Sequence, residues 1–180
     1  MRITHKLTLT ILAISFISLG AFGLVSAQSQ PMTNEQISRI KANCPSAKNI
    51  VAQLQTSDAL LRVNRGQLYE YMTTKLMGKF NTRVENNHLN ARSLVAVKDY
   101  YDNLLESFRS DYQSYAEKLN AIINIDCDQS PAEFYSAITL AREKRQRVHN
   151  DVIRLHQNIG EYKSALNAFI INFNRTSGGN

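Results

Sequence analysis

The last third of the chain carries a heptad repeat that restricts the fold more than any other feature of the sequence. From Phe134 to Phe173, seam residues recur at alternating steps of four and three. The positions are Phe134, Ile138, Ala141, Arg145, Val148, Val152, Leu155, Ile159, Tyr162, Leu166, Phe169 and Phe173. Arg145 is the one charged member. A repeat of this period holds one stripe of a helix against its neighbours and is typical of left-handed coiled-coil packing.

Two earlier segments have helical periodicity and lack internal proline. In residues 46–86 the apolar stripe is Ile50, Leu54, Leu61, Leu68, Met72, Leu76 and Phe80, and in residues 91–125 it is Leu94, Val97, Tyr101, Leu104, Phe108, Tyr112, Tyr115, Leu119 and Ile122. Polar turns at 87–90 and 126–129 separate the three segments. Short turns between long helices favour antiparallel neighbours. The sequence therefore predicts an all-α domain over residues 46–174, with three long antiparallel helices in an up-down-up coiled-coil bundle.

The prolines mark expected boundaries, because proline is poorly tolerated inside a helix. Thr33 and Gln36 form a capping-box pattern, which predicts a short extra N-terminal helix over about 34–43. Pro45 should end that helix, so residues 28–45 are expected to be a short helix and linker. Ser130, Pro131 and Glu133 are a strong start signal for the last helix. Residues 175–180 are polar and glycine-rich and are expected to be a disordered tail.

The first 27 residues have the pattern of a secretory signal peptide. Arg2 and Lys6 precede an apolar run from 7 to 25, and Ala27 ends a small-residue cleavage site. An uncleaved membrane anchor formed by residues 7–25 is the alternative. Beyond residue 27 the chain carries 19 basic and 15 acidic residues, a net charge of +4. This length is sufficient for one domain with a core of its own.

Cys44 and Cys127 are the two cysteines of the chain. A helical hairpin with its turn at 87–90 places both near the same end of the domain. Simple counting leaves them offset by about 9 Å along the axis, so an asymmetric turn or a bend at Pro45 must absorb the difference. Because exported chains form disulfides, a Cys44–Cys127 bond is expected, with two free thiols as the alternative.

Arg145 interrupts the best heptad seam and therefore needs a partner. Counting outward from the turn at Asp128 puts Asp111 at the same height on the neighbouring helix. The same reflection through the first turn leads to Gly66, which would leave room for a guanidinium. The sequence predicts a buried polar layer in which Arg145 pairs with Asp111 and fixes the register of the helices.

The densest cluster of basic residues lies in the last segment. The candidate basic patch consists of Arg142, Lys144, Arg147 and Arg154. It suits an anionic envelope polymer or lipid headgroups, although an ordinary solvated face is the simpler interpretation. No stacking platform of aromatic residues accompanies it, so specific nucleic-acid binding is not expected.

No catalytic or metal-binding motif is present in the sequence, and no cofactor is expected. The patterns HExxH, GxSxG, GxxxxGK[ST] and CxxC are absent. His149 and His156 share a helix face about 10 Å apart, too far for one metal ion. An enzyme is therefore not expected.

Three segments carry a resemblance to a group of proteins. They are LLRVNRGQLYEYMTTKLMGKFNTRV, FRSDYQSYAEKLNAIINIDC and FYSAITLAREKRQRVHNDVIRLH. They resemble uncharacterised small exported helical proteins encoded by candidate-phylum bacteria such as Saccharibacteria. The resemblance covers roughly residues 44–173 and implies export and a helical fold. It implies no activity and no functional residue.

Together these features predict an exported, non-enzymatic interaction or structural protein of the cell envelope or cell surface. The expected partner is a protein or an anionic envelope polymer, and a membrane is involved only if residues 7–25 remain as an anchor. One alternative is a periplasmic-type chaperone or stress protein, which requires an exposed apolar patch. The other, less favoured by the sequence, is an enzyme of unknown class.

Overall fold

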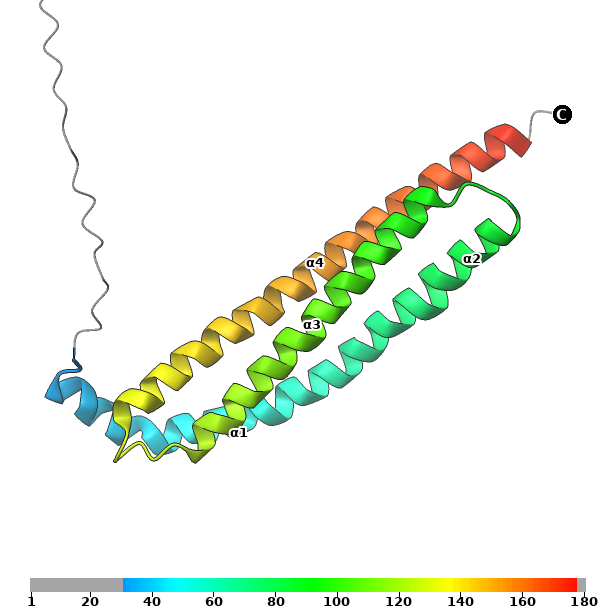
Figure 1. Cartoon of the computed structure of the whole chain (residues 1–180). Helices are drawn as coiled ribbons and strands as arrows, with labels where there is room; N and C mark the ends of the chain where they lie inside the picture. Colours follow the sequence, from blue (N-terminus) through cyan, green and yellow to red (C-terminus); the bar gives the residue numbers. More distant parts are fainter. Residues whose placement is uncertain (1–30, 178–180) are drawn as a thin grey trace, which may run out of the picture. The chain divides into compact units, whose positions relative to one another are not determined.

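The computed structural model describes residues 31–177, and all of their regular structure is helical. The elements are α1 (Asn34–Tyr71), η1 (Met72–Met77), α2 (Gly78–Asn86), α3 (Arg92–Asn124) and α4 (Pro131–Ser177). Because α1, η1 and α2 are continuous, the unit from Met32 onward contains three helical rods (Figure 1). The predictions of an all-α fold and of three long helices are confirmed. The predicted signal peptide, residues 1–27, lies outside the described residues, as does the alternative anchor.

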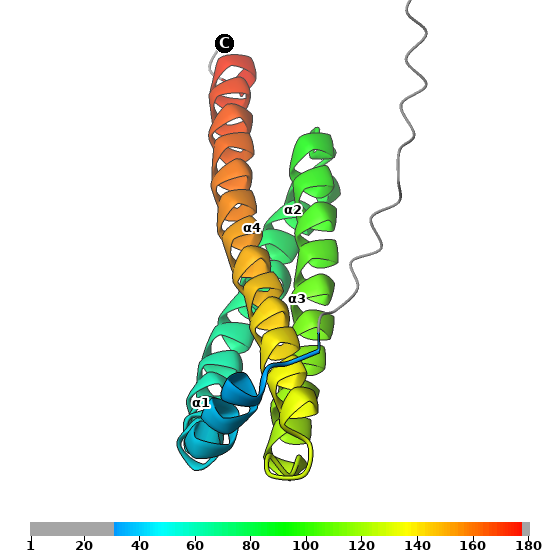
Figure 2. The same cartoon turned by 90° about the vertical axis from the view of Figure 1, so that its left-hand side faces the viewer.

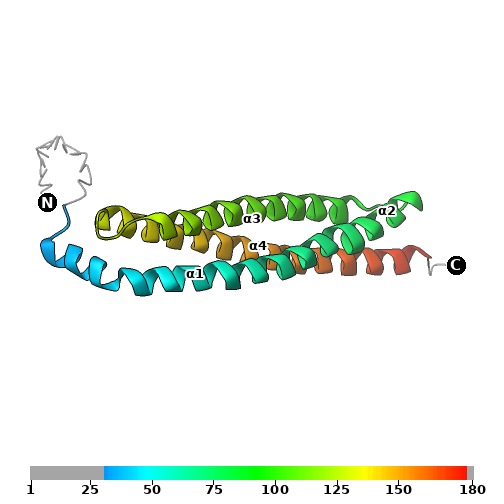
Figure 3. The same cartoon turned by 90° about the horizontal axis from the view of Figure 1, so that it is seen from below.

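The predicted separate N-terminal helix is wrong, because α1 continues through Pro45. The capping box at Thr33 is present, with both of its hydrogen bonds formed. Pro45 lacks an N–H and therefore removes only the hydrogen bond to the carbonyl of Lys41, and both residues are exposed to water. Figure 3 shows the first turns of α1 inclined to the rest of the helix, as expected for a helix that contains proline.

The two cysteines lie at the same end of the domain, as the sequence predicts. Cys44 and Cys127 form a disulfide with their Cα atoms 6.1 Å apart, within the usual range. Cys44 lies inside α1 rather than after a helix, so the inclination of the first turns brings it to the loop between α3 and α4. The bond joins this loop to α1 next to a cluster of buried residues. That cluster consists of Val51, Tyr112, Tyr115, Leu119, Ile122, Cys127, Phe134 and Ala141.

A second core cluster holds the other half of the domain together. Its buried members are Tyr69, Met77, Leu94, Tyr101, Leu104, Leu105, Phe108, Leu155 and Tyr162. Most heptad positions of α4 are buried or half-buried in one of the two clusters, whereas Arg145 and Phe173 are exposed. α4 therefore packs along α3 over most of the length of α3 (Figure 2).

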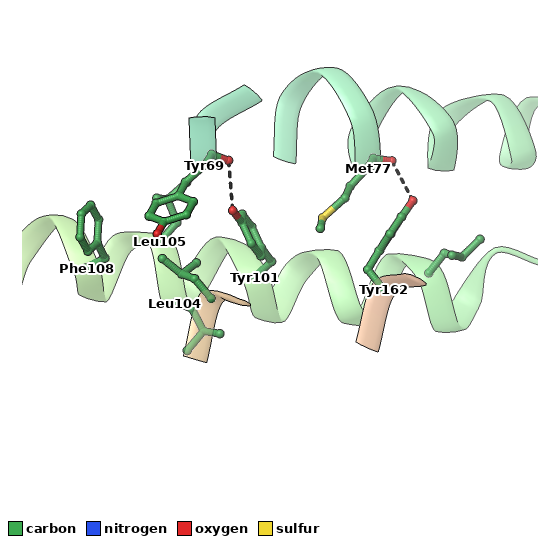
Figure 4. Close-up of a cluster of buried hydrophobic side chains, with 9 residues drawn as sticks. Tyr69, Met77, Tyr101, Leu104, Leu105, Phe108 and Tyr162 are labelled. Carbon is green, nitrogen blue, oxygen red and sulfur yellow. Dashed lines mark hydrogen bonds between the residues drawn. The ribbon is translucent and has the colours of Figure 1, made fainter. Parts of the chain in front are cut away.

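The segment η1 is a π-helical turn in the middle of the first rod. A buried tyrosine binds on each side of it. The Tyr101 hydroxyl donates to the carbonyl of Tyr69, three residues before η1, at 3.3 Å, and the Tyr162 hydroxyl donates to Oδ1 of Asn81 at 2.6 Å and also lies 3.4 Å from the carbonyl oxygen of Met77 (Figure 4). Thr73, also buried, donates to Asp102 of α3. Contacts from both α3 and α4 thus fix the wide turn in place.

Two glycines of the first rod should respond in opposite directions to alanine. A Cβ atom at Gly66 meets nothing within 4 Å, whereas at Gly78 it lies 2.9 Å from the carbonyl oxygen of Thr73. We expect Gly66→Ala to raise the free energy of unfolding by about 0.5–1 kcal/mol, because alanine favours the helix. Gly78→Ala should lower it by about 1–2 kcal/mol, because the turn must shift. Urea denaturation measures both, and a stabilising Gly78→Ala would contradict the π-helical geometry.

Unlike its two ends, the middle of α1 has little contact with the other helices. From Ala59 to Leu68 every residue except Gly66 is exposed. Upstream, Val51 belongs to the first cluster, and downstream, Tyr69 belongs to the second. α1 is therefore held at two places, and the stretch between them borders open space.

At its far end α4 continues to Ser177, so residues 175–177, predicted to be disordered, are helical. There the Thr176 hydroxyl donates to the carbonyl of Asn172.

Candidate functional site

The candidate site begins with a carboxylate that sequence analysis missed. Asp58 of α1 is buried, with 8% of its surface exposed. Its Oδ2 accepts from the Tyr115 hydroxyl at 2.9 Å and pairs with Nε of Arg145 at 3.2 Å. This cluster joins α1, α3 and α4. The cluster also raises the pKa of both side chains that donate to Asp58. Burial and the nearby Asp58 raise the pKa of Tyr115, and the hydrogen bond to Asp58 raises the pKa of Arg145.

The predicted pairing of Arg145 with Asp111 is therefore wrong. A polar connection does reach Arg145, but its acid comes from α1 instead of α3. Gly66, expected to accommodate the guanidinium, borders open space. Reflection through the α3–α4 loop gives the height of a residue but not the direction in which its side chain points, and Asp111 lies beside Asp151, six residues further along α4 than Arg145. Reflection through the first turn also assumes a constant rise, which the π-helical turn between Gly66 and that turn violates.

Asp111 instead lies beside Asp151, a second acid on α4. Asp151 is completely buried. Its Oδ1 accepts from Arg154, and its Oδ2 has no hydrogen-bond partner among the described residues. Burial raises the pKa of Asp151 above 3.8, Arg154 opposes the shift, and the negative Asp111 adds to it. Asp151 therefore takes up a proton more readily than an exposed aspartate does as the pH falls.

We expect Asp151→Asn to raise the free energy of unfolding at pH 7 by about 1–2 kcal/mol, because no charge is then buried. An acid whose pKa is raised in the folded state binds its proton more tightly there. The wild type should therefore gain stability as the pH falls from the raised pKa towards 3.8, and the variant should lack this gain. Urea denaturation at pH 4 and pH 7 measures the difference, with the exposed Asp128→Asn as control. A variant that is less stable than the wild type at both pH values would show that the ion pair with Arg154 outweighs the cost of burying the Asp151 carboxylate.

A hollow of about 560 Å³ opens next to the Asp58 cluster, between α1 and α4. Its floor is aromatic and aliphatic and includes Phe108, Tyr112, Tyr115, Val148 and Val152. Its rim carries Arg62 and Arg65 from α1 and Arg142, Arg145 and His149 from α4. Four arginines against one aspartate give the lining a formal charge of +3 with neutral histidine. We call this hollow the basic groove.

The arginines of the basic groove differ in how they are held. Arg145 is tied to Asp58, and the guanidinium of Arg62 stands over the ring of Tyr112, 5.0 Å from its centroid. Within residues 31–177, Arg62, Arg65 and Arg142 form no ion pair. Three exposed guanidinium groups are thus available to an anion.

A smaller hollow of about 180 Å³ adjoins the basic groove and shares Tyr115, Arg142 and Arg145 with it. Apart from these shared residues its lining is entirely apolar. The remaining residues are Ala47, Ile50, Val51, Leu54, Leu119, Ile122, Ile138 and Ala141. We call it the apolar annex. Together the two hollows form a path along α1 that changes from cationic to apolar.

The predicted basic patch does not form one surface. Arg142 lines the basic groove, but Lys144 donates to Ser114 of α3 at 2.6 Å and Arg154 pairs with Asp151. Arg147 is exposed and borders neither hollow. Sequence analysis missed Arg62 and Arg65, which lie on α1 about 80 residues upstream of the patch and reach it only through folding.

His156, one of the two histidines on α4, contacts a buried tyrosine of α1. The imidazole of His156 lies 3.2 Å from the Tyr69 hydroxyl, so it has a structural partner. Among the described residues, no three of the His, Cys, Asp and Glu side chains are grouped so as to hold a metal ion. In the same part of the chain, no helix has the length and apolar character needed to cross a membrane.

Comparison with protein-family models, with curated proteins and with solved structures finds no match for this chain.

Proposed function

We propose that this protein is an exported, non-enzymatic interaction protein of the cell envelope or cell surface, and that it binds an anionic partner through the basic groove. The basic groove is the observation that carries the proposal. Three guanidinium groups without an ion pair among the described residues converge there from two helices, and guanidinium groups bind phosphate and carboxylate in a bidentate manner. A groove with fixed donors and an aromatic floor supports binding, and it lacks a paired nucleophile and base for catalysis.

The proposed architecture is an antiparallel, up-down-up coiled coil. Its support is the heptad seam of α4, most of which packs in the two core clusters, and the short loops that join the helices. Such a rod presents a long groove without needing a lid. The Cys44–Cys127 pair supports an oxidising compartment.

Binding to inorganic polyphosphate tests the proposed function. We expect the purified protein to bind immobilised polyphosphate and to be released by salt, because counterions screen exposed charges. Arg62→Gln with Arg142→Gln should elute at a clearly lower salt concentration. The control is Arg83→Gln with Arg147→Gln, which removes the same charge outside the hollows. Equal elution of the two double variants would overturn the proposal, since binding would then depend only on net charge.

The proposed export rests on the N-terminal segment and predicts cleavage after Ala27, at the small-residue site. Intact mass of the protein recovered from its cells should correspond to a chain that begins at Gln28. A chain that keeps Met1 and fractionates with the membrane would instead identify residues 7–25 as an anchor.

The chaperone alternative is favoured by one observation, the exposed apolar residues of α1. They are Ile50, Leu60, Leu61, Val63, Leu68 and Tyr71, each at least half exposed. An exposed apolar surface of this kind can hold unfolded segments. Under this alternative, stoichiometric amounts of the protein suppress aggregation of a chemically denatured model protein, and Leu60→Gln with Val63→Gln abolishes the effect. Unchanged aggregation would exclude it.

A further inference from the structure

The basic groove and the apolar annex differ in chemistry yet share three lining residues. The annex offers no hydrogen-bonding group beyond the shared Tyr115, Arg142 and Arg145. A polyanion gains nothing from such a lining, because every polar group placed there loses its hydration without a replacement. An alkyl chain has no hydrogen bonds to lose, and its transfer from water into the annex is favourable. The combination therefore suits a ligand with one charged end and one apolar end.

From these two adjoining hollows we infer that the protein binds a single-chain anionic amphiphile. Its head lies in the basic groove at Arg142 and Arg62, and its alkyl chain lies in the annex along Ile50 and Leu54. This inference rests on the proposed function, since it names the class of anion that the basic groove receives. The formal charge of +3 on the basic groove complements a phosphate, sulfate or carboxylate head.

The arrangement of the shared residues fixes the direction of the ligand. Arg145 pairs with Asp58, which also accepts from the Tyr115 hydroxyl, so two of the three shared residues are joined through Asp58 at the boundary between the two hollows. Arg142 has no ion pair within residues 31–177 and lies at the same boundary. A head bound to Arg142 therefore leaves its first methylene groups at the entrance of the annex.

The two hollows limit the ligand to one chain. The annex encloses about 180 Å³, while the basic groove, at about 560 Å³, has the size of a typical small-molecule site. The walls of the annex include core residues such as Val51 and Ile122, which are almost completely buried. A second chain would have to displace them. The surface of a bilayer presents lipid headgroups, which could bind the basic groove, but its alkyl chains stay inside the bilayer and do not enter the annex.

Titration of the purified protein with dodecyl phosphate, below the concentration at which it forms micelles, tests the inference. We expect saturable binding of one molecule per chain by calorimetry and by native mass spectrometry. Butyl phosphate, whose chain is too short to fill the annex, should bind at least tenfold more weakly, because each buried methylene group raises the affinity about fourfold. This series uses the unmodified protein, so it does not depend on how any variant folds. Equal affinity for the two chain lengths would overturn the inference.

Two pairs of variants locate the ligand. Arg142→Gln should weaken dodecyl phosphate binding at least tenfold, and Arg147→Gln, on the same helix but outside both hollows, should leave it unchanged. Ile50→Gln should weaken dodecyl phosphate binding while polyphosphate binding stays intact. Its control is Leu60→Gln, which alters a similarly exposed apolar residue of α1 outside the hollows. An Ile50→Gln variant with full affinity would place the chain elsewhere and overturn the inference.

The outcomes separate the inference from the function on which it rests. Binding of polyphosphate without dodecyl phosphate leaves the proposed function in place and overturns the amphiphile. Binding to vesicles of phosphatidylglycerol without binding of the monomeric amphiphile points to a membrane surface and also overturns it. Binding of neither probe removes both proposals.

Discussion

Replacing Cys44 and Cys127 by alanine will lower the free energy of unfolding by about 4 kcal/mol. The bond spans 83 residues, and in the chain-entropy model a loop of this size removes a large share of the freedom of the unfolded chain. Cys127 is buried, so alanine also leaves a small void beside Phe134 and Ile122. Urea denaturation of the oxidised wild type and the double variant measures the difference.

Reduced wild-type protein provides the control for the disulfide. It should unfold at a urea concentration close to that of the variant, because both lack the bond. Thiol counting on the denatured, unreduced wild type should find no free thiol. Two thiols per chain would show that the bond does not form in solution and that the stability comes from packing alone.

Asp58→Ala will have the second-largest effect, a loss of about 2–3 kcal/mol. The substitution leaves the buried Tyr115 hydroxyl without an acceptor, which costs about 1–3 kcal/mol. It also leaves Arg145 without its acid, although 56% of the Arg145 side chain is exposed, so water replaces much of that interaction. Asp58→Asn should cost less, since its amide oxygen still accepts from Tyr115. Thermal or urea unfolding monitors all of these variants.

Two further variants check this assignment. Asp99→Ala, on the exposed face of α3, should change stability by no more than about 0.5 kcal/mol. Asp111→Ala should not reproduce the Asp58→Ala loss, because Asp111 does not pair with Arg145. An Asp111→Ala variant as unstable as Asp58→Ala would restore the polar layer that the sequence predicts.

The three long helices and most of their ends could be predicted from the sequence because local signals determine them. The capping pattern at Thr33 starts α1, and Pro131 starts α4 as predicted. The sequence wrongly predicts a helix end at Pro45, because the preference of proline against a helix interior is weaker than the packing of the residues around it. Residues on both sides of the proline, Ile40 and Ala47, pack against the same core cluster, and this favours one continuous helix.

The partner of Arg145 could not be predicted because it depends on the relative height and rotation of three helices. One signal was available: Asp58 lies four residues after Leu54 and three before Leu61, so it occupies a seam position with a charge. The choice between Asp58 and Ser57 as the seam residue cannot be made from spacing alone, since both fit. The π-helical turn has no comparable sequence signal, and it alters the rotation of everything that precedes it relative to α2.

The candidate site was less predictable than the fold for a related reason. The basic groove combines Arg62 and Arg65 with Arg142, and the sequence distance between the two groups hides their proximity. A basic run in one segment predicts a charged surface there. It does not predict that Lys144 donates to Ser114 and that Arg154 donates to Asp151, so that neither side chain takes part in a common basic surface.

The disulfide also has a topological consequence. By linking Cys44 to Cys127 it closes a covalent ring that includes most of α1 and all of η1, α2 and α3. A protease that cuts one peptide bond inside this ring, for example in the exposed turn around His88, opens the ring without releasing a fragment. The nicked chain remains one molecule with the same mass apart from one added water. Only a cut outside the ring, in the residues before Cys44 or after Cys127, can separate a piece of the protein from the rest.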